Sequence, residues 1–224
     1  VSLTQAGTFA DKNVGSNKVV TAGNTITGTE SGNYSLTQPT GLSADITAKA
    51  LTVTGTTVAS KVYDGTTSVV ITGGTLVGLL TGHQVTLVQS GSLVNPNVSS
   101  AAAVALNYSI SGTHAANYVL VQPSGITTIV TPAPLGITVT GVYNGTTTLT
   151  PSSFTVTGLV NSETISGLSS ASVAAANVAN NGSNYVTSVI SSGGTALLSN
   201  YRITPSYNAS SGTTNNVATI TAKA

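Results

Sequence analysis

An internal repeat is the feature that most limits how this chain can fold. Residues Val1–Gly7 (VSLTQAG) align with Val85–Gly91 (VTLVQSG), 84 positions later. The same shift places Asn33–Pro39 (NYSLTQP) on Asn117–Pro123 (NYVLVQP). A third Asn-Tyr block begins at Asn200, 83 positions after Asn117. Self-similarity at a fixed period indicates one structural unit that is used several times.

The repeat divides the chain into three parts. Lys61–Thr67 (KVYDGTT) recurs 80 positions later as Gly141–Thr147 (GVYNGTT). Together with the shifts of 84 and 83 positions, this gives a full unit of about 85 residues. We predict the C-terminal part of a unit at 1–50, a complete unit at 51–134, and a complete but divergent unit at 135–224. The connections between these parts are short, and the second is proline-rich, which favours a stiff joint.

The composition favours β-structure throughout. Hydrophobic residues make up 40% of the chain and charged residues only 5%, the reverse of a disordered sequence. Apolar residues alternate with Thr in Leu51–Gly55 and Ile137–Gly141, which is the period of a half-buried strand. We predict an all-β chain of tandem antiparallel β-sandwich-like repeats, either Ig-like or β-grasp-like, that forms an extended rod.

Turn residues divide the predicted strands. Asp64-Gly65 and Asn144-Gly145 lie between β-prone stretches, as in two-residue hairpins. Loops are expected at three further places: Gly73-Gly74, Asn95–Asn97 and Gly193-Gly194. Two Ala-rich stretches are expected to form a loop or one short turn: Ser99–Leu106 and Ala171–Asn180.

The chain offers few groups for catalysis. Its five carboxylates are Asp11, Glu30, Asp45, Asp64 and Glu163. None lies close to another in sequence, although a glycosidase needs two of them about 5–10 Å apart. Asn144 takes the place of Asp64 in the next copy, which suits a turn better than a catalytic acid. We therefore predict that the protein is not an enzyme and has no catalytic residues.

Cofactors and several classes of partner are also disfavoured. The chain has no Cys, and its acidic residues are not clustered as in calcium modules, so we predict no metal and no cofactor. His83 and His114 are expected to be surface residues. The net charge of +1 provides no basic stripe for nucleic acid. No apolar run approaches the roughly 20 residues of a membrane-spanning helix, so we predict no membrane insertion.

The repeated tyrosines allow two interpretations. Exposed Asn-Tyr pairs would suit a carbohydrate site, whereas a turn Asn followed by an inward-packed strand Tyr would be structural. We favour the structural interpretation, because each pair occupies the same place in its copy. The predicted structural turn and core residues are Tyr63, Asp64, Gly65, Tyr143, Asn144, Gly145, Asn33, Tyr34, Asn117, Tyr118, Asn200 and Tyr201.

Together, these blocks resemble the YDG-type repeat of filamentous-haemagglutinin-like bacterial adhesins. The matching blocks are Lys61–Thr67 (KVYDGTT), Phe9–Gly15 (FADKNVG), Gly32–Pro39 (GNYSLTQP) and Ala44–Thr47 (ADIT). The last copy departs from the pattern at Asn144 and in its Ala-rich stretch. The resemblance implies a very large exoprotein of a Gram-negative bacterium, exported by two-partner secretion, in which such repeats form a stalk.

Three functions follow as expectations. The first is a structural stalk of a secreted surface adhesin that supports adhesion, aggregation or biofilm formation outside the cell. The alternatives are a polysaccharide-binding module and a self-assembling extracellular filament. The expected partners are the neighbouring repeats of the same chain, with other copies of the chain or matrix polysaccharide as further candidates.

Overall fold

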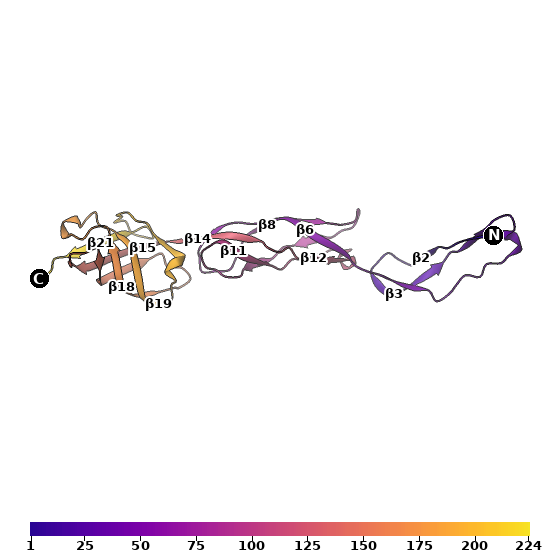
Figure 1. The fold of residues 1–224 in the computed structure, drawn as a ribbon, viewed down its shortest axis with the longest axis horizontal. Coiled ribbons are helices and arrows are strands. Elements are labelled where there is room, and N and C mark those ends of the chain that lie inside the picture. The colour runs from indigo at the N-terminus through magenta and orange to yellow at the C-terminus, as the bar shows by residue number, and fades with distance from the viewer. The chain divides into compact units, whose positions relative to one another are not determined.

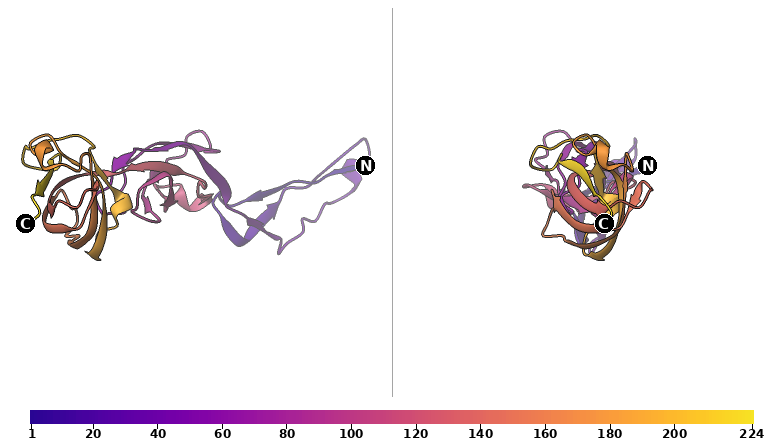
Figure 2. Two further views of the ribbon diagram at one scale, coloured as in Figure 1. Left: turned by 60° about the vertical axis from the view of Figure 1, so that its left-hand side comes forward. Right: turned by 90° about the vertical axis from the view of Figure 1, so that its left-hand side faces the viewer.

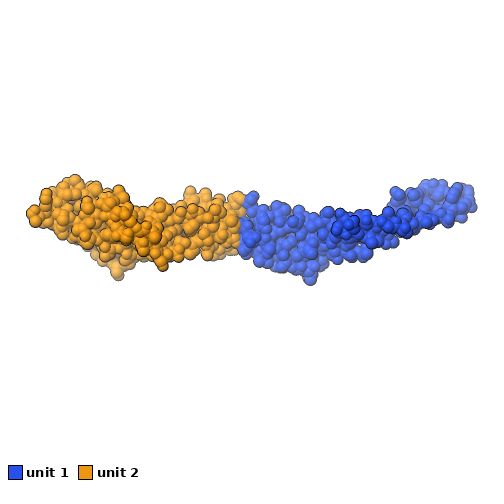
Figure 3. All heavy atoms as spheres, turned by 90° about the horizontal axis from the view of Figure 1, so that it is seen from below, with its two compact units in different colours: residues 1–56, 73–90, 106–124 blue, residues 57–72, 91–105, 125–224 orange.

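The computed structural model describes residues 1–224, which form 21 strands and four short 3₁₀ turns. No α-helix is present, so the all-β prediction is confirmed. None of its helical segments is long and apolar enough to cross a membrane. The chain divides into two compact units, coloured separately in Figure 3. Unit 1 comprises residues 1–56, 73–90 and 106–124, and unit 2 comprises residues 57–72, 91–105 and 125–224.

Most elements lie wholly in unit 1 or wholly in unit 2, and Figure 1 labels several of them. Those of unit 1 are β1 (Ser2–Thr4), β2 (Gly7–Phe9), β3 (Gly15–Ala22), β4 (Thr25–Thr27), η1 (Ser31–Asn33), β5 (Ser43–Ile46), β9 (Thr86–Val88), β12 (Ser109–Ser111), η2 (Ala115–Asn117) and β13 (Tyr118–Leu120). Those of unit 2 are β7 (Lys61–Val62), β10 (Gly91–Leu93), β14 (Thr127–Thr131), β15 (Ala133–Val142), β16 (Thr148–Leu149), β17 (Pro151–Thr157), β18 (Ile165–Val173), η3 (Val178–Asn180), β19 (Val186–Gly194), η4 (Leu198–Asn200), β20 (Tyr201–Ile203) and β21 (Asn216–Thr221). Three strands contribute residues to both units: β6 (Lys49–Val58), β8 (Ile71–Val77) and β11 (Ser99–Leu106).

Unit 1 consists of small sheets with little core. β1 pairs with β4, β9 pairs with β12, and β3 lies between β2 and β5, all in antiparallel register. β13 adds to β6 in parallel register. Only Leu51, Tyr108 and Tyr118 are buried hydrophobic residues in this unit. Backbone pairing and side-chain hydrogen bonds therefore carry much of its structure.

Unit 2 has a continuous apolar core built around β15. Its alternate residues Leu135, Ile137 and Val139 are 1%, 1% and 2% exposed. β17 pairs antiparallel with β15, while β20 and β21 pair with it in parallel. The strands of this region, from red to yellow in Figure 2, pack around one interior. Each fully buried side chain of this size stabilises the fold by about 1.5–3 kcal/mol relative to exposure.

The sheets are mixed: the predicted antiparallel pairing is confirmed for several sheets, but other strand pairs are parallel. Parallel pairs join β13 to β6, β14 to β7, and β15 to both β20 and β21. The burial of β15 explains its parallel neighbours, because parallel strands are usually covered on both faces. Apolar and Thr residues alternate along β6 and β15 as predicted.

The predicted hairpins at Asp64-Gly65 and Asn144-Gly145 are turns but not hairpins. β7 pairs with β14, and no strand folds back on it after Gly65. Instead, the Asp64 carboxylate accepts a hydrogen bond from the Thr66 N–H at 2.9 Å, and Asn144 makes the same 2.9 Å bond with the Thr146 N–H. An Asx side chain that satisfies its own backbone in this way competes with hairpin pairing.

Two stretches that were expected to be irregular form strands in the structure. Gly73-Gly74 lies inside β8, where both residues have positive φ, at 72° and 84°. Ser99–Leu106 forms β11, in which small Ala side chains such as the buried Ala102 pack closely against β14. Tertiary packing thus overrides the local preference of alanine.

The other three stretches predicted to be irregular are confirmed only in part. Asn95–Asn97 is a loop. Gly193-Gly194 lies at the end of β19 rather than in a loop. Ala171–Asn180 begins in β18 and ends in the short turn η3, so the predicted turn occupies only its second half.

Candidate functional site

The Asn-Tyr block at residues 117–118 anchors a polar cluster in unit 1. The Tyr118 cluster comprises Asn13, Val14, His83, Asn117 and Tyr118. Asn117 ends η2 and Tyr118 begins β13. The Asn117 carboxamide accepts a hydrogen bond from the Val14 N–H at 2.8 Å and donates one to Asn13 Oδ1 at 3.1 Å. One side chain thus holds a loop that lies 103 positions earlier in the chain.

Two histidines complete the surroundings of Tyr118. Its hydroxyl accepts a hydrogen bond from the Leu80 N–H at 3.2 Å and is bonded to His83 Nδ1 at 2.7 Å. His83 stacks on His114, with ring centroids 4.3 Å apart and 20° between the planes. The Gln84 N–H donates to His114 Nδ1 at 3.0 Å. The two histidines, predicted to be separate surface residues, are therefore half-buried neighbours.

The surroundings of His83 favour its neutral form. Burial lowers the pKa of the His83 imidazole below its ordinary value of 6.5, and the charges of His114 and Lys12 lower it further. A neutral Nδ1 can accept the hydrogen bond of the Tyr118 hydroxyl, which already receives one from Leu80. Protonation of His83 would remove that acceptor.

A second cluster in unit 2 repeats the asparagine contact. The Tyr201 cluster comprises Asn97, Val98, Glu163, Asn200 and Tyr201. Asn200 ends η4 and is only 1% exposed. Its carboxamide accepts from the Val98 N–H at 2.9 Å and donates to Asn97 Oδ1 at 2.8 Å. Asn200 and Asn117 therefore make the same pair of bonds to matching Asn-Val pairs.

The tyrosine of the second cluster meets a carboxylate. The Tyr201 hydroxyl accepts from the Val160 N–H at 3.1 Å and donates to Glu163 Oε2 at 2.7 Å. Burial raises the pKa of Tyr201 to about 12, and its hydrogen bond to Glu163 contributes in the same direction. The Tyr201 hydroxyl is thus held as a protonated donor.

The Tyr-Asp-Gly turn at 63–65 packs directly on the Tyr201 cluster. Tyr63 is 4% exposed, and its ring lies edge-on to Tyr201 at 5.6 Å. The Tyr63 hydroxyl donates to Glu163 Oε1, and burial, followed by this bond, raises the pKa of Tyr63. Glu163 therefore accepts hydrogen bonds from two tyrosines through its two oxygens.

The backbone of Gly65 also contributes to the packing of this turn on the Tyr201 cluster. Its carbonyl accepts a hydrogen bond from Asn161 Nδ2 at 3.2 Å. Its φ of 72° lies in the left-handed region, and a Cβ at Gly65 would lie 2.5 Å from Asn161 Cβ. Only glycine fits both the conformation and the close approach.

Asp64 serves the turn, as the sequence predicts. Its carboxylate forms a 2.7 Å ion pair with Lys61 and bonds to the Thr66 backbone. The later copy has Gly141 and Asn144 at the positions of this ion pair. There the Asn144 amide donates to the Thr148 carbonyl at 2.8 Å. Both charges are thus replaced together, and the turn is retained.

The prediction that the tyrosines pack inward is right for three residues and wrong for two. Tyr63, Tyr118 and Tyr201 are buried, so their rings are not free to stack on a sugar. Tyr34 is 65% exposed and Tyr143 is 39% exposed. The difference follows from packing, because no polar loop and partner ring cover these two.

The other carboxylates have local, separate roles. Asp11 pairs with Lys18, and Asp45 Oδ1 accepts from the Asn17 N–H at 2.7 Å. Glu30 accepts from Asn33 Nδ2 at 2.7 Å. No group of three or more His, Asp or Glu side chains is placed to hold a metal ion. These contacts order local backbone.

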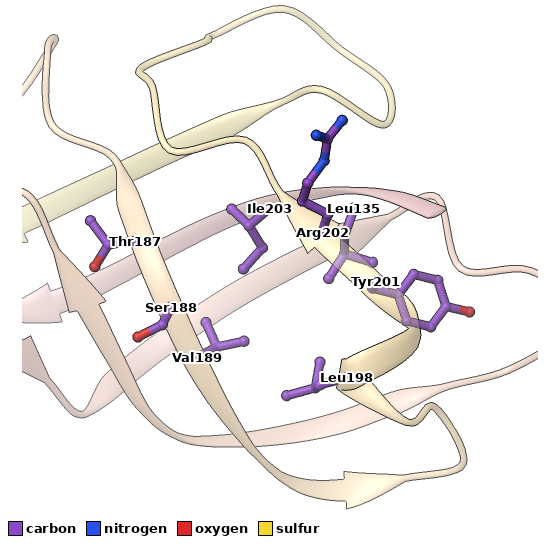
Figure 4. Close-up of a pocket in the computed structure, with 8 residues that line it drawn as sticks. All are labelled: Leu135, Thr187, Ser188, Val189, Leu198, Tyr201, Arg202 and Ile203. Atoms are coloured by element: carbon purple, nitrogen blue, oxygen red, sulfur yellow. The ribbon is translucent and has the colours of Figure 1, made fainter. Parts of the chain in front are cut away.

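A surface pocket of about 270 Å³ lies beside the Tyr201 cluster in unit 2 (Figure 4). The lining residues are Leu135, Thr187, Ser188, Val189, Leu198, Tyr201, Arg202 and Ile203. Figure 4 shows the Tyr201 hydroxyl directed away from the other labelled side chains. No carboxylate or imidazole lines this pocket, so its lining offers no acid–base pair.

Sequence reasoning missed the groups that meet the tyrosine hydroxyls. His83 and Glu163 differ in type, and neither stands out as part of a repeated block. A positional signal was available, because Gly78-Leu79-Leu80 and Gly158-Leu159-Val160 recur 80 positions apart and precede them at equal distance. The matching backbone donors, Leu80 and Val160, lie in these blocks.

The comparisons with known proteins identify a family that covers just over half of the chain. The YDG domain model matches residues 1–41 and 47–127, which is more than half of the chain. Residues 128–224 lie outside the match. No curated protein and no solved structure matched the chain.

Proposed function

Because the chain belongs to the YDG domain family, we propose that it is a structural stalk segment of a secreted bacterial surface adhesin. In this proposal, tandem β-sandwich-like repeats of about 85 residues form a rod that holds an adhesive region away from a Gram-negative cell. The segment supports adhesion, aggregation or biofilm formation and catalyses no reaction. Its primary partners are the neighbouring repeats of the same chain.

One observation carries the proposal, and it concerns the two Asn-Tyr blocks whose tyrosine is buried. The asparagine of each block bonds to an Asn-Val pair that lies about one repeat before the matching Asn-Val pair of its own copy. Asn117 bonds to Asn13 and Val14, and Asn200 bonds to Asn97 and Val98. If the repeats end near residues 50 and 134, as the sequence predicts, both sets of bonds join neighbouring repeats. The two clusters are then inter-repeat joints.

The geometry of these joints suits a stiff connection. A carboxamide that both accepts and donates fixes two atoms of the opposite loop, which restricts rotation as well as separation. In unit 2 the edge-on contact between Tyr63 and Tyr201 and their shared Glu163 add further restraints. A Gly/Ser-rich linker, in contrast, would behave as a flexible coil.

The surface composition supports an extracellular structural role. Only 5% of the residues are charged and none is Cys, while hydroxyl and amide side chains are abundant. Such a surface is hydrated without strong fields. Low net charge also favours association between molecules, which an aggregating adhesin can use.

Distance measurements across the second joint test this proposal. Spin labels on cysteines introduced at the exposed Ser100 and Ser188 report on both sides of the Tyr201 cluster, and the chain has no other Cys. We expect one narrow distance distribution in the unsubstituted joint and a clearly broader one after Asn200→Ala. Asn107→Ala is the matched control, since Asn107 is exposed and lies outside the cluster.

Two results would count against a stalk. A broad distribution in the unsubstituted joint would show a flexible connection. A distribution unchanged by Asn200→Ala, in a folded chain, would show that the asparagine contact does not hold the joint.

A further inference from the structure

The two histidines of the chain meet beside the Tyr118 cluster. Their rings stack with centroids 4.3 Å apart, and we call His83 and His114 the imidazole pair. His114 Nδ1 accepts from the Gln84 N–H at 3.0 Å, and His83 Nδ1 lies 2.7 Å from the Tyr118 hydroxyl. Because each Nδ1 is used as an acceptor, each ring is neutral and carries its proton on Nε2.

The imidazole pair holds both ends of the short turn η2 (Ala115–Asn117). His114 directly precedes the turn, and its N–H also donates to the Gln84 carbonyl at 3.3 Å. Tyr118 directly follows the turn, and its hydroxyl bonds to His83. A turn of three residues has little hydrogen bonding of its own, so contacts at its ends fix its position.

This turn carries the asparagine that holds the neighbouring repeat. Asn117 is the last residue of η2, and its carboxamide bonds to the Val14 N–H and to Asn13 Oδ1. A continuous series of contacts therefore runs from the imidazole pair through η2 to the loop at residues 12–14. The joint formed by the Tyr118 cluster is called the first joint.

Protonation of the imidazole pair would break this series of contacts. A protonated Nδ1 is a donor, so His83 could no longer accept from the Tyr118 hydroxyl. For the same reason, His114 could no longer accept from the Gln84 N–H. Two charged rings that are stacked at this distance also repel each other. Both ends of η2 would lose a contact together.

The charges around His83 act in the same direction. Burial lowers the pKa of His83, and the charges of His114 and Lys12 lower it further. Lys12 belongs to the loop that the first joint holds, so a protonated His83 would repel that loop. Asp11, the carboxylate next to Lys12, is engaged in an ion pair with Lys18. Acid thus both releases the turn and repels the loop that the turn holds.

We propose that the imidazole pair is an acid-sensitive switch: protonation of both rings frees η2, and with it Asn117, from the loop at residues 12–14. The first joint is stiff at neutral pH and flexible in mildly acidic surroundings. This inference rests on the proposed role of the two clusters as inter-repeat joints. It adds regulation by pH to that role.

The second joint, at the Tyr201 cluster, lacks this switch. Glu163 bonds to the tyrosine hydroxyl where the first joint has His83. Leu197 directly precedes η4, as His114 precedes η2. Neither position of the imidazole pair is a histidine there, so the second joint has no ring to protonate. Mild acid therefore loosens one joint and leaves the other stiff.

Spin-label distances across the first joint test the switch. Cysteines introduced at Ser16 and Ser109 place labels at exposed positions of the two repeats that this joint connects. In the unsubstituted chain we expect a narrow distance distribution at about pH 7.5 and a clearly broader one at about pH 5, because histidine titrates in this range. The double variant His83→Gln and His114→Gln has no imidazole to titrate, so its distribution should be the same at both pH values.

The control is the Ser100 and Ser188 pair across the second joint, whose distribution should stay narrow at both pH values. Circular dichroism verifies that each chain is folded, and global unfolding of the unsubstituted chain at about pH 5 would overturn a local switch. A first-joint distribution that does not change with pH also overturns it, as does a change that persists in the double variant or appears equally in the control. If the control pair is narrow at neutral pH while the first joint does not respond to pH, the stalk stands and only the switch fails.

Discussion

The Tyr118 and Tyr201 clusters share a backbone arrangement but place different groups against the tyrosine hydroxyl. In both, a backbone N–H donates to the hydroxyl from three positions before the partner residue. That partner is an imidazole at His83 and a carboxylate at Glu163. The backbone arrangement therefore positions the tyrosine hydroxyl in both clusters. The residue bonded to the hydroxyl determines how strong the hydrogen bond is and how it responds to pH.

The clusters also differ in how deeply they are buried. Asn200 is 1% exposed and lies beside the apolar core of unit 2, whereas Asn117 remains partly exposed in a unit with few buried side chains. Hydrogen bonds that are shielded from water are costlier to break, because the abandoned groups stay unsatisfied. The same pair of bonds should thus be worth more in unit 2.

Asn200→Ala and Asn117→Ala test that difference most strongly. Asn200→Ala leaves the Val98 N–H and the Asn97 amide without their partner in a shielded site, so we expect a loss of about 3 kcal/mol in unfolding free energy. Asn117→Ala should cost about 1 kcal/mol, because water replaces the amide. Urea unfolding measures both, with the exposed Asn107→Ala as control. Equal losses would show that burial does not separate the clusters.

Substitution of the hydroxyl partners gives a smaller contrast. Glu163→Ala removes the acceptor of both Tyr63 and Tyr201, so we expect a loss of about 2 kcal/mol. His83→Ala removes the acceptor of one tyrosine and should cost less. Glu163→Gln keeps one carbonyl oxygen and should fall between Glu163→Ala and the unsubstituted chain. The measurement is urea unfolding at neutral pH, and a larger effect of His83→Ala would reverse the comparison.

The features of these clusters that depend on neighbouring residues in the chain are predicted well from the sequence. Turn residues such as Asn117 and Gly65 are set by neighbouring backbone, and the buried strand Tyr118 follows from its apolar alternation. These features depend on a few adjacent residues, so pattern alone finds them. Asn144 in place of Asp64 likewise indicates a turn rather than an acid.

The contacts between residues far apart in the chain could not be predicted from the sequence pattern. Glu163 meets Tyr63 across 100 positions, and Asn200 meets Asn97 across 103. Neither the parallel addition of β7 to β14 nor the edge-on contact of Tyr63 with Tyr201 leaves a local signature. For the same reason, Tyr63 and Tyr143 look equivalent in sequence although one is covered and the other is exposed.

Alkaline pH should weaken the Tyr201 cluster selectively. The pKa of Tyr201 is raised to about 12 from an ordinary 10.0, so its contribution to stability is complete below pH 10 and is lost as the pH rises toward 12. Two pKa units correspond to about 2.7 kcal/mol at the limit. We expect thermal unfolding between pH 9 and 12 to show this loss, and Tyr201→Phe to flatten most of the slope. An unchanged slope in Tyr201→Phe would assign the loss to other groups.

Acid should weaken the Tyr118 cluster, by the smallest amount. The pKa of His83 lies below 6.5 in the folded chain, so its neutral form stabilises the fold above pH 6.5, and this contribution is lost as the pH falls below that value. The charged ring would face His114 and Lys12 and would no longer accept from Tyr118. His83→Gln keeps a polar side chain but does not titrate, so it should remove the loss between pH 7 and 5. Glu163→Gln is the matched variant in the other cluster and should leave that acid loss in place, because it keeps both histidines.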